Sequence, residues 1–231
     1  MKKTATVLIL LVALLFVTNG VAQVQLGIQT GANFGDVKLD PMPEGTETGM
    51  RTGFLIGGVL YYSFMPILGL QIEPAYVQKG AKVDLSFTEE GSTIKLEQTA
   101  SMDYIDIPVM LKASLGNGPV KPYLLAGATA AFLLGDATAE IDKATLDGED
   151  VTNMIPDDEK VDTLQVKSSD FTLNFGAGVI IPLGVVNIFV EGQYNLGLSD
   201  INDEDPIPGE PEMTIKSTGI QAKVGVLFPL N

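Results

Sequence analysis

The chain has 231 residues, with 29 acidic and 14 basic side chains and a net charge of −15 at pH 7. It contains neither Cys nor His, which excludes disulfides, a lipid anchor on Cys, zinc sites built from His and Cys, and catalytic Ser-His or Asp-His pairs. The acidic balance excludes nucleic acid as a partner, because that binding depends on Lys and Arg neutralising phosphates. We therefore expect no enzymatic activity and no cofactor.

The first 22 residues have the pattern of a secretory signal peptide. Two lysines precede the uncharged run 5–17, and small residues at 20–22 resemble a signal peptidase site. The run is shorter than the roughly 20 apolar residues that a membrane-spanning helix needs. We expect residues 1–22 to be cleaved and residues 23–231 to form one domain. An uncleaved N-terminal anchor is the alternative.

Eight segments of alternating apolar and polar residues follow the leader. In the first, Val24, Leu26 and Ile28 share one face, whereas Gln25 and Gln29 share the other. An apolar face with a period of two residues predicts a β-strand. The eight predicted strands span residues 24–34, 51–64, 68–82, 102–115, 120–134, 169–181, 185–198 and 214–228.

The connections between these segments alternate between long and short. The short ones, at 65–67, 116–119 and 182–184, have the Gly and Pro of tight turns. This rhythm predicts an up-and-down barrel with both termini at the short-turn end, where outer-membrane barrels have their periplasmic turns. The acidic residues then gather in the extracellular connections. These long connections span 36–50, 83–101, 135–168 and 200–213, of which 83–101 should partly extend its strands as a hairpin.

The choice of inward face separates two classes of barrel. A soluble lipocalin-like carrier turns its apolar face inward, whereas a membrane barrel turns it toward lipid. Here the second face consists of Gly, Gln, Asn, Glu and Lys, which suit a narrow, packed interior. The predicted fold is therefore all-β, an eight-stranded antiparallel up-and-down transmembrane β-barrel in the outer membrane. A soluble periplasmic carrier is the alternative.

Four charged side chains fall on the predicted interior face. They are Glu73, Lys112, Glu191 and Lys223. A buried carboxylate without a partner is very costly, so opposite charges in the lumen should pair. Counting from the short turns predicts a Glu191–Lys223 pair and a Glu73–Lys112 pair, with about two residues of stagger left open. An eight-stranded interior holds side chains and no aqueous channel.

Several strand motifs resemble those of a known family. They are Leu-Gln-Ile-Glu-Pro-Ala-Tyr-Val-Gln-Lys-Gly-Ala-Lys at 70–82, Tyr-Ile-Asp-Ile-Pro-Val-Met-Leu-Lys at 104–112, Lys-Pro-Tyr-Leu-Leu-Ala-Gly at 121–127 and Glu-Gly-Gln-Tyr-Asn-Leu-Gly-Leu at 191–198. In this order they resemble the PorT-like outer-membrane β-barrel family, often described as porin-family proteins. The resemblance implies an eight-stranded outer-membrane barrel and brings no catalytic residues. The founding member is linked to protein secretion and gliding, a role that would rest here on analogy alone.

Two further sets of residues are candidates for specific roles. Asp200, Asn202 and Glu204 could offer oxygen ligands for Ca²⁺, but their spacing lacks the full EF-hand pattern, and ordinary solvated loop charge is the favoured interpretation. Phe228, close to the C-terminus, resembles the signal read by the barrel-assembly machinery. The predicted interfacial aromatic residues are Tyr62, Phe64, Tyr76, Tyr123, Tyr194 and Phe228.

The sequence as a whole predicts a structural or interaction role in the envelope. The options are envelope integrity, adhesion, or a place in a secretion complex. Expected partners are outer-membrane lipid and lipopolysaccharide, with a possible protein partner at the extracellular loops. A narrow transport barrel or a small-ligand-binding barrel is the alternative, and the test is whether the interior is packed.

Overall fold

The computed structural model describes residues 23–89, 91–116, 118–204 and 212–230; the predicted signal peptide lies outside these ranges. The described residues form twelve strands and one short 3-10 helix. None of their helices is long and apolar enough to cross a membrane.

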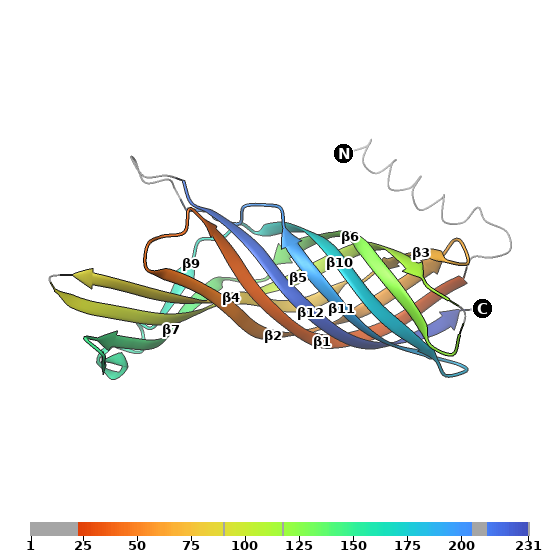
Figure 1. Ribbon diagram of the computed structural model, residues 1–231, viewed down its shortest axis with the longest axis horizontal. Coiled ribbons are helices and arrows are strands. Elements are labelled where there is room, and N and C mark those ends of the chain that lie inside the picture. The colour runs from red at the N-terminus through yellow and green to blue at the C-terminus, as the bar shows by residue number, and fades with distance from the viewer. Residues whose placement is uncertain (1–22, 90, 117, 205–211, 231) are drawn as a thin grey trace.

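Antiparallel pairing closes the strands into a barrel (Figure 1). The circuit runs from β2 through β1, β12, β11, β10, β6 and β5, and returns to β2 through β3 and β4. Every neighbour is antiparallel, so the predicted all-β antiparallel barrel is confirmed. The bounds are β1 (Gln23–Asp40), β2 (Thr46–Ser63), β3 (Leu68–Ile72), β4 (Ala75–Glu89), β5 (Ser92–Ser114), β6 (Lys121–Leu133), β10 (Ser169–Pro182), β11 (Asn187–Gly197) and β12 (Thr214–Leu230).

The strands number twelve where the sequence predicted eight. One reason is Pro74, which lacks the N–H that a ladder needs and interrupts the third predicted strand between β3 and β4. Both pieces pair with β2 and β5, so they share one position in the circuit. The carbonyl of Pro74 still accepts the N–H of Gly58 at 2.9 Å, which holds the break against β2.

The second reason lies in the connection 135–168, which is not the loop that the sequence predicted. It contains β7 (Ala137–Leu146), β8 (Glu149–Asp150), a 3-10 helix (Thr152–Met154) and β9 (Val161–Leu164). β7 pairs with the outer part of β5, and β9 pairs with β7. Together with the β4–β5 hairpin, which was predicted, they project beyond the barrel at the end away from the termini (Figure 1). We call this part the outer extension.

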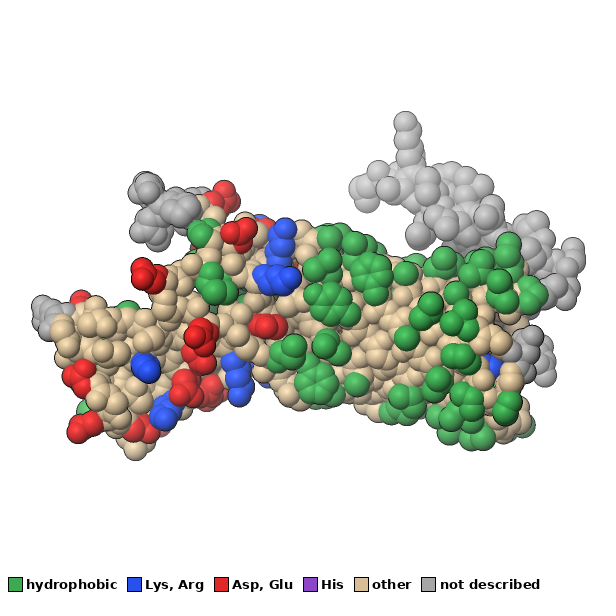
Figure 2. Space-filling view, viewed as in Figure 1, with side chains coloured by type: hydrophobic (Ala, Val, Ile, Leu, Met, Phe, Trp, Pro, Cys, Tyr) green, Lys and Arg blue, Asp and Glu red, His purple; other side chains and the backbone are tan. Residues whose placement is uncertain are grey.

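The two faces of the wall differ as a lipid-embedded barrel requires. Outward side chains such as Ile28, Ile56 and Phe175 are half or more exposed, whereas inward Gln29 and Asn174 are buried. Figure 2 shows the apolar side chains covering the part of the barrel nearest the termini and the charged side chains at the other end. The apolar face therefore points outward, and the lipocalin-like orientation is wrong for this part of the wall.

Three inward aromatic rings lie against glycines of neighbouring strands. Tyr61 covers Gly69, Tyr123 covers Gly178 and Phe189 covers Gly225, each so closely that a Cβ on the glycine would meet the ring within 2.6 Å. Such pairs fill the space that a glycine leaves in a sheet. Tyr123 was predicted at the membrane interface, but it is only 1% exposed and faces inward, which corrects that assignment.

We expect Gly178→Val to destabilise the barrel. The added Cβ would lie 2.4 Å from Tyr123 Cζ and 2.6 Å from the carbonyl of Val190, and overpacking of this kind costs about 1–3 kcal/mol. The measurement is the free energy of unfolding in urea in lipid vesicles. The control is Gly192→Ala, whose new Cβ meets nothing nearer than 4.0 Å. Equal stability of the two variants would contradict the ring–glycine packing.

Candidate functional site

Seven polar side chains from five strands and the β3–β4 junction meet in the lumen, and none of them is more than 4% exposed. The alternation of each strand directs them inward, because neighbouring positions point to lipid. The strands β1, β3, β5, β11 and β12 supply six members, and the seventh lies in the break before Pro74. The members are Gln29, Gln71, Glu73, Lys112, Glu191, Gln193 and Lys223, which we call the lumen cluster.

Lys223 is the cation that both carboxylates share. Its Nζ lies 2.5 Å from Glu73 Oε2 and 3.5 Å from Glu191 Oε1. Glu73 also accepts hydrogen bonds from the amide of Gln71 at 2.5 Å and, at 3.4 Å, from that of Gln193. The structure thus brings Glu191 and Lys223 together, as the register count anticipated, and places Glu73 on the same lysine.

Lys112 has a different environment from the one predicted. Its Nζ donates to Gln71 Oε1 at 2.8 Å, and it lies 3.7 Å from the ring centre of Tyr123 and 5.0 Å from that of Tyr61. No ion pair of the described residues joins Lys112 to Glu73, so the predicted pair is wrong. Gln71 links the two instead, and the aromatic faces stabilise the ammonium.

Uncharged polar and apolar side chains fill the barrel on both sides of the lumen cluster. Toward the outer end, Asn174 accepts from Thr129 and Thr172 and donates to Asn195. Each end is then filled by an apolar cluster. The inner one, nearer the termini, consists of Val59, Met110, Tyr123, Leu125, Ile180, Phe189 and Leu227. The outer one consists of Met102, Tyr104, Ala131, Ala137 and Ile201.

A second group of buried charges, which the sequence reading missed, lies at the level of the outer cluster. Lys79 Nζ pairs with Asp106 Oδ1 at 2.9 Å. Asp170 accepts hydrogen bonds from Ser199 at 2.7 Å and Ser217 at 2.5 Å. Strand alternation could have predicted that both aspartates point inward. Asp106 lies on the same face of its strand as the inward Lys112, and Asp170 precedes the outward Phe171.

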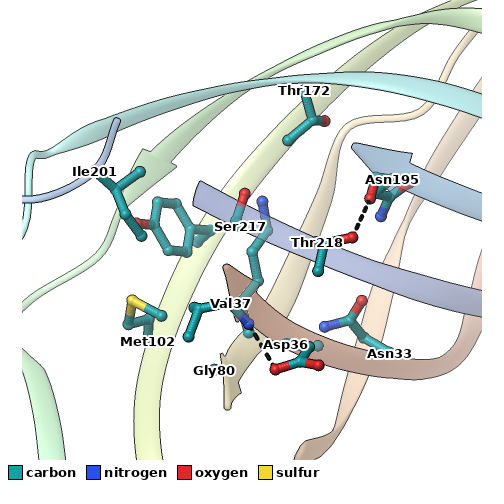
Figure 3. A pocket seen from close by; sticks show the side chains of 13 residues that line it. Asn33, Asp36, Val37, Gly80, Met102, Thr172, Asn195, Ile201, Ser217 and Thr218 are labelled. Atoms are coloured by element: carbon teal, nitrogen blue, oxygen red, sulfur yellow. Dashed lines mark hydrogen bonds between the residues drawn. The ribbon is translucent and has the colours of Figure 1, made fainter. Parts of the chain in front are cut away.

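A cavity of about 20 Å³ lies between the amide layer and the outer cluster. Figure 3 shows Val37, Met102 and Ile201 on one side of it, and Asn195 and Thr218 on the other. Such a volume holds about one water molecule. The interior therefore changes here from polar to apolar without opening into a channel.

The side-chain oxygens of two candidate Ca²⁺ ligands, Asp200 and Asn202, already accept hydrogen bonds from backbone N–H groups. Asp200 Oδ1 accepts the N–H groups of Ile215 at 2.8 Å and Asn202 at 3.1 Å, and Asn202 Oδ1 accepts the N–H of Glu204 at 3.2 Å. Burial alone would raise the pKa of the Asp200 carboxyl, but these bonds and Lys167 hold its pKa below the usual value. Within the described ranges, no three acidic side chains are grouped to hold a metal ion. A cation here would have to displace the existing bonds.

The remaining predicted interfacial aromatics are not buried. Tyr194 is 42% exposed and Phe228 is 48% exposed, and Tyr62, Phe64 and Tyr76 are partly exposed. Tyr76 packs against Phe54 with ring centres 5.5 Å apart, and Tyr62 against Phe64 at 6.4 Å. Their accessibility is compatible with contacts to the interfacial region of a membrane.

A closed antiparallel ring with an apolar outer belt and a packed polar lumen defines a β-barrel of the outer membrane. The model of the family described as outer membrane protein beta-barrel domain matches residues 19–203, and the chain belongs to this family. The comparison with curated proteins gave no match.

Solved structures with a similar chain course share little sequence with this chain. Neisserial surface protein A is 16% identical, with 88% of this chain and 96% of that chain covered and a TM-score of 0.40. OprG from Pseudomonas aeruginosa is 13% identical, with 91% and 95% covered and a TM-score of 0.47. At such values these likenesses say nothing about function.

We expect Lys223→Met to cost about 3–5 kcal/mol of unfolding free energy, because it leaves two buried carboxylates without their shared cation. Urea unfolding in lipid vesicles measures this loss. Lys112→Met is the matched control and should cost less, since its ammonium makes its direct contacts with the neutral Gln71 and with aromatic rings and forms no ion pair with a described residue within 4.0 Å. Adding Glu73→Gln to Lys223→Met should restore part of the loss. Equal losses for the two lysine variants would refute the assignment.

Proposed function

We propose that this protein is a non-enzymatic structural and interaction barrel of the outer membrane, and not a pore. The packed lumen is the observation that carries the proposal. The lumen cluster fills the cross-section with side chains that are bonded to one another, and an apolar cluster fills the barrel on each side of it. Passage of a solute would require breaking buried ion pairs, which supports a closed wall over the narrow-transport alternative.

Planar-bilayer recordings test the closed lumen. We expect no stepwise conductance from the wild-type protein at neutral pH. The variant Glu73→Ala/Lys223→Ala should also stay closed, because Phe189 and Leu227 of the inner cluster remain in place. The control for insertion is the shift in gel migration on boiling, which reports a folded barrel. Regular conductance steps from the wild-type protein would overturn the proposal.

The outer extension is the surface that we propose for a protein partner. It carries the acidic residues of the predicted long connection, and Figure 2 shows carboxylates gathered at this end of the molecule. Adhesion, envelope integrity and membership of a secretion complex are all compatible with such a display. The PorT-like resemblance favours the secretion complex. The exposed Phe228 on β12 is our proposed contact for the barrel-assembly machinery.

Lipopolysaccharide is the lipid partner that we propose for the outer edge of the belt. Lys38 on β1 and Lys216 on β12 lie directly opposite each other, and both are exposed. Like charges at directly opposed positions destabilise a sheet, so an anion between them would relieve the repulsion.

We expect lipopolysaccharide to raise the unfolding temperature of the detergent-solubilised protein, because its phosphates bridge the two lysines. Lys38→Glu/Lys216→Glu should remove most of this stabilisation. Lys143→Glu, on the outer extension, should leave it unchanged. Thermal unfolding with and without lipopolysaccharide gives the readout. The same stabilisation in all three proteins would show that these lysines do not bind the phosphates.

A further inference from the structure

The alternation of the wall reverses at the outer end of the barrel. Within the belt, the outward side chains are mostly apolar, and the polar side chains of the lumen cluster point inward. Beyond it, Val37 and Leu39 of β1 point inward, whereas Lys38 and Asp40 are exposed. The outer part of β4 has the same arrangement, because Val83 and Leu85 are partly buried while Lys82 and Asp84 are exposed. Water replaces lipid outside, and the outer end is built like a soluble barrel.

The reversed walls enclose a cavity of about 370 Å³, which we call the outer cup. Its lining comes from β1, β2, β4, β5, β7, β9 and β12 and from the segments that follow β1, β9 and β11. The apolar members include Val37, Leu39, Val83, Leu85, Leu164 and Ile215. This volume falls in the range of small-molecule sites. We propose that the outer cup binds a small, uncharged apolar molecule from outside the cell.

The floor of the outer cup separates it from the lumen. Val37, Met102 and Ile201 line both the cup and the 20 Å³ cavity beneath it, where Figure 3 shows them together. Met102 and Ile201 belong to the outer apolar cluster and are at most 4% exposed. A ligand in the cup is therefore held and does not pass through the barrel.

The polar groups of the outer cup determine the charge of the ligand. Asn202 is already engaged, since its amide donates to the carbonyl of Met213 at 2.8 Å and its oxygen accepts from Glu204. Glu204 is exposed and adds a carboxylate to the lining, and the whole chain carries a net charge of −15. Among the described residues, no Lys or Arg lines the cup. Anions such as fatty acids are thus disfavoured relative to neutral molecules.

Methionine methyl NMR in lipid nanodiscs tests this proposal, because Met102 and Met213 line the cup whereas Met110 lies in the inner cluster. The probe is N-phenyl-1-naphthylamine, which is neutral. We expect saturable shifts of the Met102 and Met213 signals and none for Met110. The sulfonated analogue 8-anilino-1-naphthalenesulfonate should bind at least tenfold more weakly.

Variants distinguish binding of the probe in the cup from partitioning of the probe into lipid. Ala139→Phe fills the cup and should weaken probe binding at least tenfold, whereas Ala128→Phe, on the exposed face of β6, should leave it unchanged. Leu85→Glu places a charge in the cup without filling it and should also weaken binding. Gel migration without boiling verifies that each variant is folded.

Three outcomes would overturn the proposal. They are linear shifts of all methionine signals, unchanged affinity in both cup variants, and signals of Met102 and Met213 that follow protein concentration instead of probe. The last would mean that a second copy covers the cup. The conductance of the barrel is independent of all three, so the proposed closed wall is tested separately.

Discussion

Lys223 holds together the part of the barrel that lipid cannot stabilise. A strand that crosses the membrane has only the lumen for its charged side chains, and a lone carboxylate there is very costly. Lys223 contacts both Glu73 and Glu191, so one ammonium links β12 with β11 and with the break between β3 and β4. The packed cross-section at this level depends on this neutralisation, because without Lys223 two buried carboxylates would lack their shared cation.

Much of this interior could be predicted from period-two alternation. Glu73, Lys112, Glu191 and Lys223 were placed inward from the sequence, and all four are buried. The pairing was harder to predict, because register counting compares neighbouring strands only. β12 has β1 and β11 as neighbours, so the contact of Lys223 with Glu73 crosses the lumen and follows from its narrowness. Gln71, an uncharged residue that the count ignored, links Glu73 to Lys112.

The outer end was predicted less well, for reasons that specific residues show. The strands of the outer extension lie among acidic and turn-forming residues, so the sequence pattern there predicted a loop. β7 forms a strand because the outer part of β5 offers it a free edge to pair with. On β1 the sequence does contain a signal for the reversal of the wall. Apolar residues lie at even positions up to Phe34 and at odd positions from Val37 onward. A change of parity within one strand marks the point where the surroundings change from lipid to water. Tyr123 was misplaced because β6 is apolar on both faces, and only the space over Gly178 decides its direction.

The reversal at Val37 separates two parts of the interior with different roles, the lumen cluster and the outer cup. Inside the belt, every charged side chain of the lumen cluster is paired or hydrogen-bonded, and such a network fixes the shape of the wall. Beyond the belt, the inward side chains are apolar and open to water, where filling by an apolar molecule is favourable. Met102 and Ile201 lie at the boundary, since each contributes to the seal below and to the cup above. Substitutions below them should therefore change stability, and substitutions above them should change recognition.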